Sequence, residues 1–259
     1  MYNSFFIRKS DQFFLKDNDI AKKIVNSLSF QNYNSVVEVG PGLGILTQNL
    51  LKCVASNHLF LIESDKDLIH FLMKFFPISK NRIIHNTFLK WNPDQIFLKN
   101  FAIIGNFPYS ISSPILFHIL KYSRYIPECI GMFQKEFAEK ITSHKGGNRY
   151  GRLSVLIQIF YEVKYLFNVE SSFFYPKPNV CSAVISLKRK KKVFTPVYQQ
   201  LLFKCVQMAF HQRRKKLKNS LKLWNHLSKF HEISFLDKRA EELSAKDFLK
   251  LTKEIEIRK

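Results

Sequence analysis

Residues 35–51, SVVEVGPGLGILTQNLL, place a strand, a glycine-rich turn and a helix in immediate succession. The β-branched run at 35–39 predicts the strand, and the apolar residues at 45, 46, 50 and 51 recur at helical spacing. Between them lies the pattern E-x-G-x-G-x-G at residues 38–44. A strand that leads through a tight turn into a helix is typical of an α/β fold, and we expect this stretch to be its centre.

The same alternation of strands and helices continues along the chain. Further apolar runs predict strands at residues 58–62, 82–85, 101–105 and 129–133, an amphipathic helix at 67–76, and an antiparallel edge pair at 164–169 and 182–187. This order predicts a doubly wound, mostly parallel sheet with helices on both faces. In such a sheet ligands bind beyond the carboxyl ends of the strands, so the turns at those ends should converge on one crevice.

A basic tract at residues 188–192, KRKKK, marks a change in composition. Beyond it the pattern is helical, with amphipathic stretches at 199–210, 215–223 and 245–255. We therefore expect two domains, an α/β domain at residues 1–190 and a small all-helical domain at residues 191–259.

Positive charge is concentrated in this C-terminal quarter. The chain of 259 residues has a formal net charge of +21, and residues 188–259 hold 20 Lys and Arg against 7 Asp and Glu. A basic surplus attracts polyanions, which favours a nucleic-acid partner. Codon bias toward Lys, Asn, Phe and Ile is the alternative explanation, but bias alone does not gather charge in one region.

Several classes of protein are not indicated. No run of 18 uninterrupted apolar residues predicts a membrane span, and the mixed charges among the first 16 residues do not resemble a signal peptide, so we expect a cytoplasmic protein. The four cysteines are scattered, without a CxxC pair or a histidine at ligand spacing. Neither a zinc site nor a disulfide framework is predicted.

The glycine turn and a following acidic residue together predict a nucleoside cofactor. Gly40 and Gly42 let a ligand approach the backbone closely, and Glu63 ends the next strand, where a carboxylate can accept both ribose hydroxyls. Glu38 disfavours a phosphate at the turn but suits a cationic amino-acid ligand. S-adenosylmethionine has that chemistry. A tight turn with no ligand remains the structural alternative.

A second turn, Asn106-Phe107-Pro108-Tyr109, follows the predicted strand at 101–105. The exocyclic amine of a nucleobase is a poor nucleophile until acceptors hold its N–H groups, and an Asn side-chain oxygen with a nearby backbone carbonyl supplies two acceptors. Pro108 stiffens the turn, and Tyr109 offers a ring on which a flipped base can stack. The alternative is an ordinary turn after a strand.

Seven motifs in order give the chain an end-to-end resemblance to a known family. They lie at residues 9–25, 38–44, 106–109, 134–138, 150–155, 174–182 and 209–221. The chain resembles the KsgA (RsmA) family of small-subunit rRNA adenine N6,N6-dimethyltransferases. The resemblance implies a seven-stranded Rossmann-like methyltransferase domain, a helical rRNA-binding domain, and S-adenosylmethionine-dependent dimethylation of two adjacent adenosines near the 3′ end of 16S rRNA. It also implies a role in ribosome biogenesis on the 30S particle, and we expect a monomer.

The resemblance also implies roles for individual residues. Asn106 and the Pro108 carbonyl would accept from the adenine amine, while Tyr109 and Phe174 would stack on the base. The implied cofactor-binding residues are Phe13, Leu15, Gly40, Gly42, Glu63, Thr87 and Asn106, and the implied rRNA-binding residues are Arg213, Arg214, Lys215, Lys216 and Lys218. No metal is implied.

The chain departs from the family at several positions. Asp11 and Phe13 flank Gln12 where the family usually has Gly and a polar Asn or His, and Thr87 stands where the family usually has an Asp that accepts from the cofactor's adenine amine. A hydroxyl can still accept, but without charge assistance. Phe107 replaces the usual Leu. We expect weaker cofactor binding and retained activity.

Two other functions remain open from the sequence. The macrolide-resistance type of adenine methyltransferase acts on 23S rRNA and shares the cofactor and catalytic turns, although the Arg213-Arg214-Lys215 signature argues against it. A non-catalytic 30S assembly factor would keep the fold with an idle cofactor site. Phe13 and Thr87 motivate that alternative, and the intact Asn106 turn opposes it.

Overall fold

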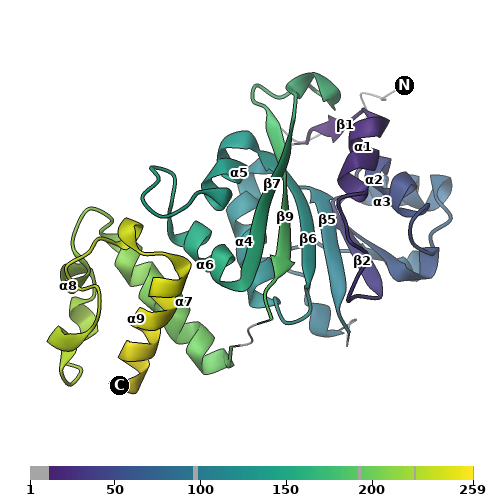
Figure 1. Cartoon of the computed structure of the whole chain (residues 1–259). Coiled ribbons are helices and arrows are strands. Elements are labelled where there is room, and N and C mark those ends of the chain that lie inside the picture. The colour runs from purple at the N-terminus through teal and green to yellow at the C-terminus, as the bar shows by residue number, and fades with distance from the viewer. Residues whose placement is uncertain (1–11, 96–98, 192–193, 225, 259) are drawn as a thin grey trace. The chain divides into compact units, whose positions relative to one another are not determined.

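The computed structural model describes residues 12–95, 99–191, 194–224 and 226–258 (Figure 1). By the contacts of its backbone the chain divides into two compact units. Unit 1 comprises Met1–Ala138 and Lys164–Arg189, and unit 2 comprises Glu139–Val163 and Lys190–Lys259. Asp11 and Lys192, which figured in the sequence expectations, lie outside the described residues. The segment 139–163, which the predicted boundary at residue 190 would assign to the α/β domain, groups with the C-terminal segment.

A seven-stranded sheet with the order β4-β3-β2-β5-β6-β9-β7 forms the centre of unit 1. Its strands are β2 (Ser35–Val39), β3 (Leu59–Glu63), β4 (Ile83–His85), β5 (Phe101–Asn106), β6 (Glu128–Gln134), β7 (Tyr161–Val169) and β9 (Ser182–Arg189). The pairs that link β4, β3, β2, β5 and β6 are parallel, whereas β9 pairs antiparallel with β6. The predicted doubly wound, mostly parallel sheet is therefore confirmed, and the two strands predicted as an edge pair, β7 and β9, are neighbours in it.

One face of the sheet is covered by the first three α-helices of the described residues. These are α1 (Asn18–Val25), α2 (Ile45–Leu50) and α3 (Lys66–Phe75). Alternate residues of the strands point to this face, among them Leu59 and Leu61 of β3, and they join the helices in one buried cluster. Figure 1 shows these helices on one side of the sheet and α4 (Ser112–Lys121) on the other.

The opposite face is closed by aromatic contacts around α4. The Trp91 ring lies 5.6 Å from the ring of Phe101 in β5, and the His118 ring of α4 lies 4.7 Å from that of Phe88. Because both faces are covered, the central strands are buried along their length, and ligands can enter only at the strand ends.

A two-stranded sheet brings the start of the described chain to the carboxyl ends of the central strands. β1 (Phe14–Leu15) pairs antiparallel with β8 (Phe174–Tyr175), with Phe14 opposite Tyr175 and Leu15 opposite Phe174. The Lys16 N–H also donates to the Phe173 carbonyl at 2.8 Å. This small sheet was not predicted, because its two strands are short and lie far apart in the sequence.

Unit 2 is helical. Its main helices are α6 (Arg152–Phe160), α7 (Pro196–His211) and α9 (Ala245–Ile257), and α5 (Lys135–Thr142) spans the junction with unit 1. The rings of Phe210 and Phe248 stack 5.8 Å apart between α7 and α9, and the ring of Phe203 lies 6.1 Å from that of Phe160 on α6. Aromatic side chains thus form much of the contact between these helices.

The predicted helix at 215–223 is wrong in its extent. Only α8 (Leu217–Ser220) forms there, followed by a 3₁₀ turn at Lys222–Trp224. The N–H groups of Leu217 and Lys218 donate to the carbonyls of Lys238 and Leu236 at 2.8 and 2.9 Å. Because these donors are satisfied by a distant segment, the helix begins only after Lys216, and no local pattern in the sequence signals it.

Candidate active site

Three turns at the carboxyl ends of β2, β3 and β5 line one cavity in unit 1. Its lining combines the glycine turn, Glu63, residues 86–88, the Asn106 turn and residues 12–15 from the start of the described chain. The sequence predicted that the turns would converge on one crevice, and this is confirmed.

The glycine turn adopts backbone angles that favour glycine. Gly40, Gly42 and Gly44 have φ values of 66°, 55° and 78°, all in the left-handed region. A Cβ on Gly40 would meet no atom within 4 Å, whereas one on Gly44 would lie 2.4 Å from the Phe76 ring. Gly44 therefore allows the turn to pack on Phe76, and Gly40 leaves the cavity wall open to a ligand.

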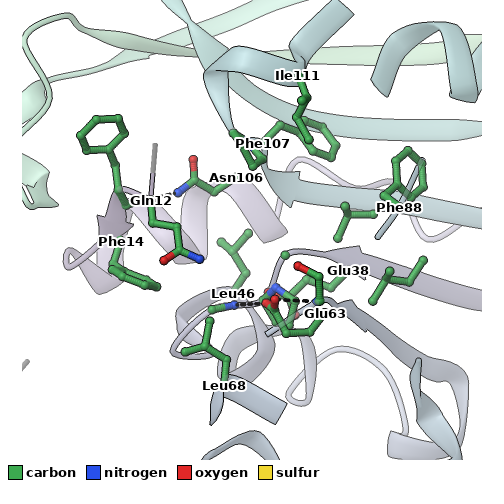
Figure 2. A pocket seen from close by; sticks show the side chains of 18 of the residues that line it. Gln12, Phe14, Glu38, Leu46, Glu63, Leu68, Phe88, Asn106, Phe107 and Ile111 are labelled. Carbon is green, nitrogen blue, oxygen red and sulfur yellow. Dashed lines mark hydrogen bonds between the residues drawn. The ribbon is translucent and has the colours of Figure 1, made fainter. Parts of the chain in front are cut away.

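Two buried carboxyl groups lie at the ends of adjacent strands (Figure 2). Glu38 is 1% exposed and accepts from the Thr47 hydroxyl at 2.7 Å, and burial raises its pKa to about 8. Oε1 of Glu63 accepts from the backbone N–H groups of Ser64 and Asp65 at 2.7 and 3.0 Å. Burial also raises the pKa of Glu63, and these N–H groups oppose the rise because they favour the charged form.

Two carboxyl groups line the cavity, and the described residues place no cation against them. Among the described residues, those that line it include no Lys, Arg or His. The side-chain oxygen of Gln12 in this lining is buried and has no hydrogen-bond partner in the described part of the chain. An unpaired buried acceptor is costly, which indicates that a donor belongs beside it. The arrangement suits a cationic ligand with hydroxyl groups and disfavours a phosphate.

The side chain of Asn106 is held in one orientation. Its Nδ2 donates to the Phe13 carbonyl at 2.8 Å, so that its Oδ1 is left as an acceptor at the cavity. Asn106 is the last residue of β5, and the buried strand fixes its backbone. An amide bound through its nitrogen presents its oxygen, which is the group that an amine substrate needs.

Two further residues of this turn complete the local geometry. The Tyr109 hydroxyl lies 2.6 Å from Ser182 Oγ on β9, and burial raises the pKa of Tyr109, so the phenol stays neutral. The Pro108 carbonyl accepts from the Ile111 N–H at 3.3 Å and from Ser112 Oγ at 3.4 Å. Both bonds are long, and a carbonyl has two lone pairs, so this oxygen keeps acceptor capacity.

Nearly all the predicted catalytic and cofactor-binding residues line the cavity. They are Phe13, Leu15, Gly40, Gly42, Glu63, Thr87, Asn106, Pro108 and Tyr109. Thr87 is exposed, and its backbone N–H donates to Asn86 Oδ1 at 2.8 Å. Phe174 differs from the others, because its side chain is 1% exposed in the core cluster that contains Leu15, and it does not line the cavity. Its stacking role stays a prediction.

Phe107 fits the core although it is larger than the usual Leu. Its side chain is 1% exposed, and its ring lies 5.0 Å from that of Phe133. A Cβ on Gly105 would lie 2.9 Å from the Phe107 ring, and one on Gly131 would lie 2.6 Å from it. Two glycines on adjacent strands therefore make room for the ring.

The sequence interpretation assigned no role to several residues that shape the cavity. Phe14 lines it, Thr47 bonds Glu38, and Ser182 bonds Tyr109. Phe14 and Ser182 lie within motifs that carry the resemblance, which is the signal that could have singled them out. Thr47 sits nine residues after Glu38 on α2, and only the folded turn brings the two together.

The predicted rRNA-binding residues lie in unit 2 and differ in their surroundings. Arg213 donates through Nε to Glu241 at 2.6 Å and through a terminal nitrogen to the Asn148 carbonyl at 2.9 Å. Lys216 and Lys218 both pair with Asp237, at 3.3 and 2.9 Å. Arg214 and Lys215 are exposed. Arg213 is therefore engaged in contacts within unit 2, whereas Arg214 and Lys215 lie at its surface.

The described residues hold neither a metal-binding cluster nor a membrane-spanning helix. No group of three or more His, Cys, Asp or Glu side chains in the described ranges is arranged to hold a metal ion. None of the helices in the described part of the chain has the length and apolar character needed to cross a bilayer.

Comparison with known proteins gives a consistent family. The family model described as ribosomal RNA adenine dimethylase matches residues 5–256. The ribosomal RNA small subunit methyltransferase A of Flavobacterium johnsoniae is 47% identical over 246 residues, which cover 95% of this chain and 94% of that protein. The crystal structure of a dimethyladenosine transferase from Plasmodium falciparum has a TM-score of 0.81 at 26% identity, covering 95% of this chain and 98% of that one. The 23S rRNA methyltransferase ErmE, at a TM-score of 0.67 and 22% identity over 94% of this chain and 99% of that one, shares the fold.

Proposed function

We propose a function from one established premise: this chain belongs to the ribosomal RNA adenine dimethylase family. It uses S-adenosylmethionine to dimethylate N6 of two adjacent adenosines in the hairpin loop near the 3′ end of 16S rRNA. It acts on the 30S particle in the cytoplasm, as a monomer, during small-subunit biogenesis. Residues 1–190 carry the methyltransferase site, and residues 191–259 supply the basic rRNA-binding surface.

The orientation of Asn106 carries this proposal. Its Nδ2 is bound to the Phe13 carbonyl at 2.8 Å, so Oδ1 accepts one N–H of the adenine amine, and the Pro108 carbonyl accepts the other. Acceptors on both N–H groups favour a pyramidal nitrogen and release its lone pair for attack. The neutral ring of Tyr109 supplies a stacking surface that holds the flipped base in line.

The residues of the cavity fit the methyl donor. The Glu63 carboxylate can accept from ribose hydroxyls, and the Gly40 position, where a Cβ would meet no atom within 4 Å, leaves room for the ligand to approach the backbone. Bound there, S-adenosylmethionine supplies a methyl group on a cationic sulfur. Thr87 offers a hydroxyl to the adenine of the cofactor, a weaker acceptor than a carboxylate.

Direct displacement accounts for the transfer. With S-adenosylmethionine bound, the amine nitrogen would form a bond to the methyl carbon, the electron pair of the broken carbon–sulfur bond would pass to sulfur, and one N–H proton would pass to water. After the first transfer the nitrogen retains a single N–H, for which one of the two acceptors suffices. Proximity and acceptor geometry supply the acceleration.

The test is to incubate the protein with unmethylated 30S particles and S-adenosylmethionine labelled in its methyl group. The rRNA is then digested and its modified nucleosides are identified. N6,N6-dimethyladenosine from the 3′ hairpin of 16S rRNA is expected, and Asn106→Ala should abolish it while 30S binding persists. The same product from 23S rRNA alone would support the macrolide-resistance type. Binding to 30S particles without any product would support a non-catalytic assembly factor.

A further inference from the structure

Two adjacent aromatic residues enter the cavity from the extended segment before α1. Side chains at successive positions of an extended chain point to opposite sides, so Phe13 and Phe14 diverge. The ring of Phe14 lies over the glycine turn, because a Cβ on Gly42 would be 3.0 Å from Phe14 Cε1. Figure 2 shows Phe14 on the side of the cavity that holds Leu46 and Leu68, while Asn106 and Phe107 lie on the other side.

Phe13 contacts the Asn106 turn twice. Its ring centroid lies 5.4 Å from that of Tyr109, with the planes tilted by 30°, and its carbonyl accepts from Asn106 Nδ2 at 2.8 Å. The rings are in direct contact and leave no room for a base between them. They therefore form one continuous aromatic surface beside the Asn106 oxygen.

The backbone of Phe13 is anchored by its neighbours. The two residues that follow it pair with β8, and the Lys16 N–H donates to the Phe173 carbonyl at 2.8 Å. This pairing holds the Phe13 carbonyl where Asn106 needs it. Phe174, which the resemblance implies as the second stacking ring, lies on β8, the partner strand of β1. Its side chain is buried and does not line the cavity.

We propose that Phe13 belongs to the target-adenine side of the cavity and Phe14 to the cofactor side. The Phe13 ring extends the Tyr109 surface on which the flipped adenine stacks, and the Phe13 carbonyl orients Asn106. This inference rests on the proposed function and replaces the cofactor-binding role that the resemblance implies for position 13. A phenyl ring cannot form the side-chain hydrogen bond that the family's Asn or His can form there, and it gains a contact with the base instead.

The test pairs Phe13→Leu with Phe14→Leu, because both substitutions keep an apolar side chain and remove a ring. For each variant, calorimetric titration gives the Kd of S-adenosylhomocysteine, and methylation of unmethylated 30S particles at saturating S-adenosylmethionine gives kcat and KM. Base stacking on an aromatic ring is worth about 1–3 kcal/mol, so Phe13→Leu should lower kcat/KM for 30S particles by about 5- to 150-fold. Its Kd for S-adenosylhomocysteine should stay within about twofold, because the Phe13 ring lies against Tyr109 on the side of the Asn106 turn.

Phe14→Leu should show the reverse pattern, with a higher Kd for S-adenosylhomocysteine and an unchanged KM for 30S particles. Phe13→Tyr keeps a ring and should recover most of the kcat/KM that Phe13→Leu loses, which separates stacking from a general loss of structure. The proposal is overturned if Phe13→Leu weakens S-adenosylhomocysteine binding as much as Phe14→Leu does, or if Phe13→Tyr is as impaired as Phe13→Leu. A wild-type protein that methylates no adenosine would refute the proposed function itself, a result distinct from either of these.

Discussion

Replacing Asn106 by Asp separates acceptor strength from acceptor orientation. The substitution is isosteric and puts a second oxygen in place of Nδ2, the atom that now donates to the Phe13 carbonyl at 2.8 Å. Two oxygens at that separation, neither carrying a hydrogen, repel each other. The carboxylate must rotate away or take up a proton, and the Phe13 carbonyl loses its donor in a half-buried position.

The expected loss follows from this contact. Leaving one partner of a buried hydrogen bond unsatisfied costs about 1–3 kcal/mol, which corresponds to a fall of about 5- to 150-fold in kcat if the cost appears in the transition state. Acceptor strength alone predicts the opposite result, since a carboxylate accepts more strongly than an amide. The sign of the change therefore decides between the two explanations.

Single-turnover methylation of unmethylated 30S particles, with cofactor and enzyme in excess, measures the chemical step. Asn106→Ala, which removes both the acceptor and the donor, should be the least active, with Asn106→Asp between it and the wild type. Thermal unfolding of all three proteins controls for loss of structure. An Asn106→Asp enzyme within twofold of the wild-type rate would show that the bond to the Phe13 carbonyl does not set the reactive geometry.

Four further changes test other parts of the site and of unit 2. Burial raises the pKa of Glu38 from 4.5 to about 8, so between these pH values the folded protein holds a proton that the unfolded chain releases. The free energy of unfolding should therefore fall as pH rises through that interval, by a few kcal/mol in all. Glu38→Gln should flatten this dependence in denaturant titrations between pH 5 and about 8. Thr87→Asp should tighten S-adenosylmethionine binding in a calorimetric titration, by about fivefold or more, because a charged acceptor replaces a neutral one. Gly44→Ala should lower the free energy of unfolding by about 1–3 kcal/mol, because its methyl group would lie 2.4 Å from the Phe76 ring at a φ of 78°. Arg214→Ala should reduce the salt dependence of 30S binding by about one unit of slope in a log–log plot, and an unchanged slope would exclude a phosphate contact.

The central strands of the sheet were predictable from sequence because they are buried on both faces. A strand of that kind reads as a continuous apolar run, and each run here ends in a turn of distinctive composition, such as Gly40 to Gly44 or Asn106 to Tyr109. Parallel connection then forces those turns to the same edge. Convergence of the turns on one cavity therefore needed no information beyond the order of the elements.

The contacts that orient the site were not predictable in the same way. Asn106 donates to the Phe13 carbonyl, which lies 93 residues away in the sequence, and the hydroxyls of Tyr109 and Ser182 share a hydrogen bond across a separation of 73 residues. Neither pair follows from a local period or propensity, since each depends on how the β1–β8 pair and β9 are placed. The burial of Phe174 has the same origin, because its partner Leu15 lies at the other end of unit 1's sequence.

The charge of unit 2 shows why composition alone does not separate the cations that hold a fold together from those that a partner could reach. Arg213 is less exposed than its neighbours, and its two bonds, to Glu241 and to the Asn148 carbonyl, join three segments of the unit. Lys216 and Lys218 share one exposed Asp237, and exposed ion pairs contribute only about 0–1 kcal/mol. A phosphate can therefore compete for those lysines at little cost, whereas engaging Arg213 would disrupt the unit that presents them. The signature that the sequence reads as one basic patch is thus divided in the fold between a residue that builds the surface and residues that remain available to RNA.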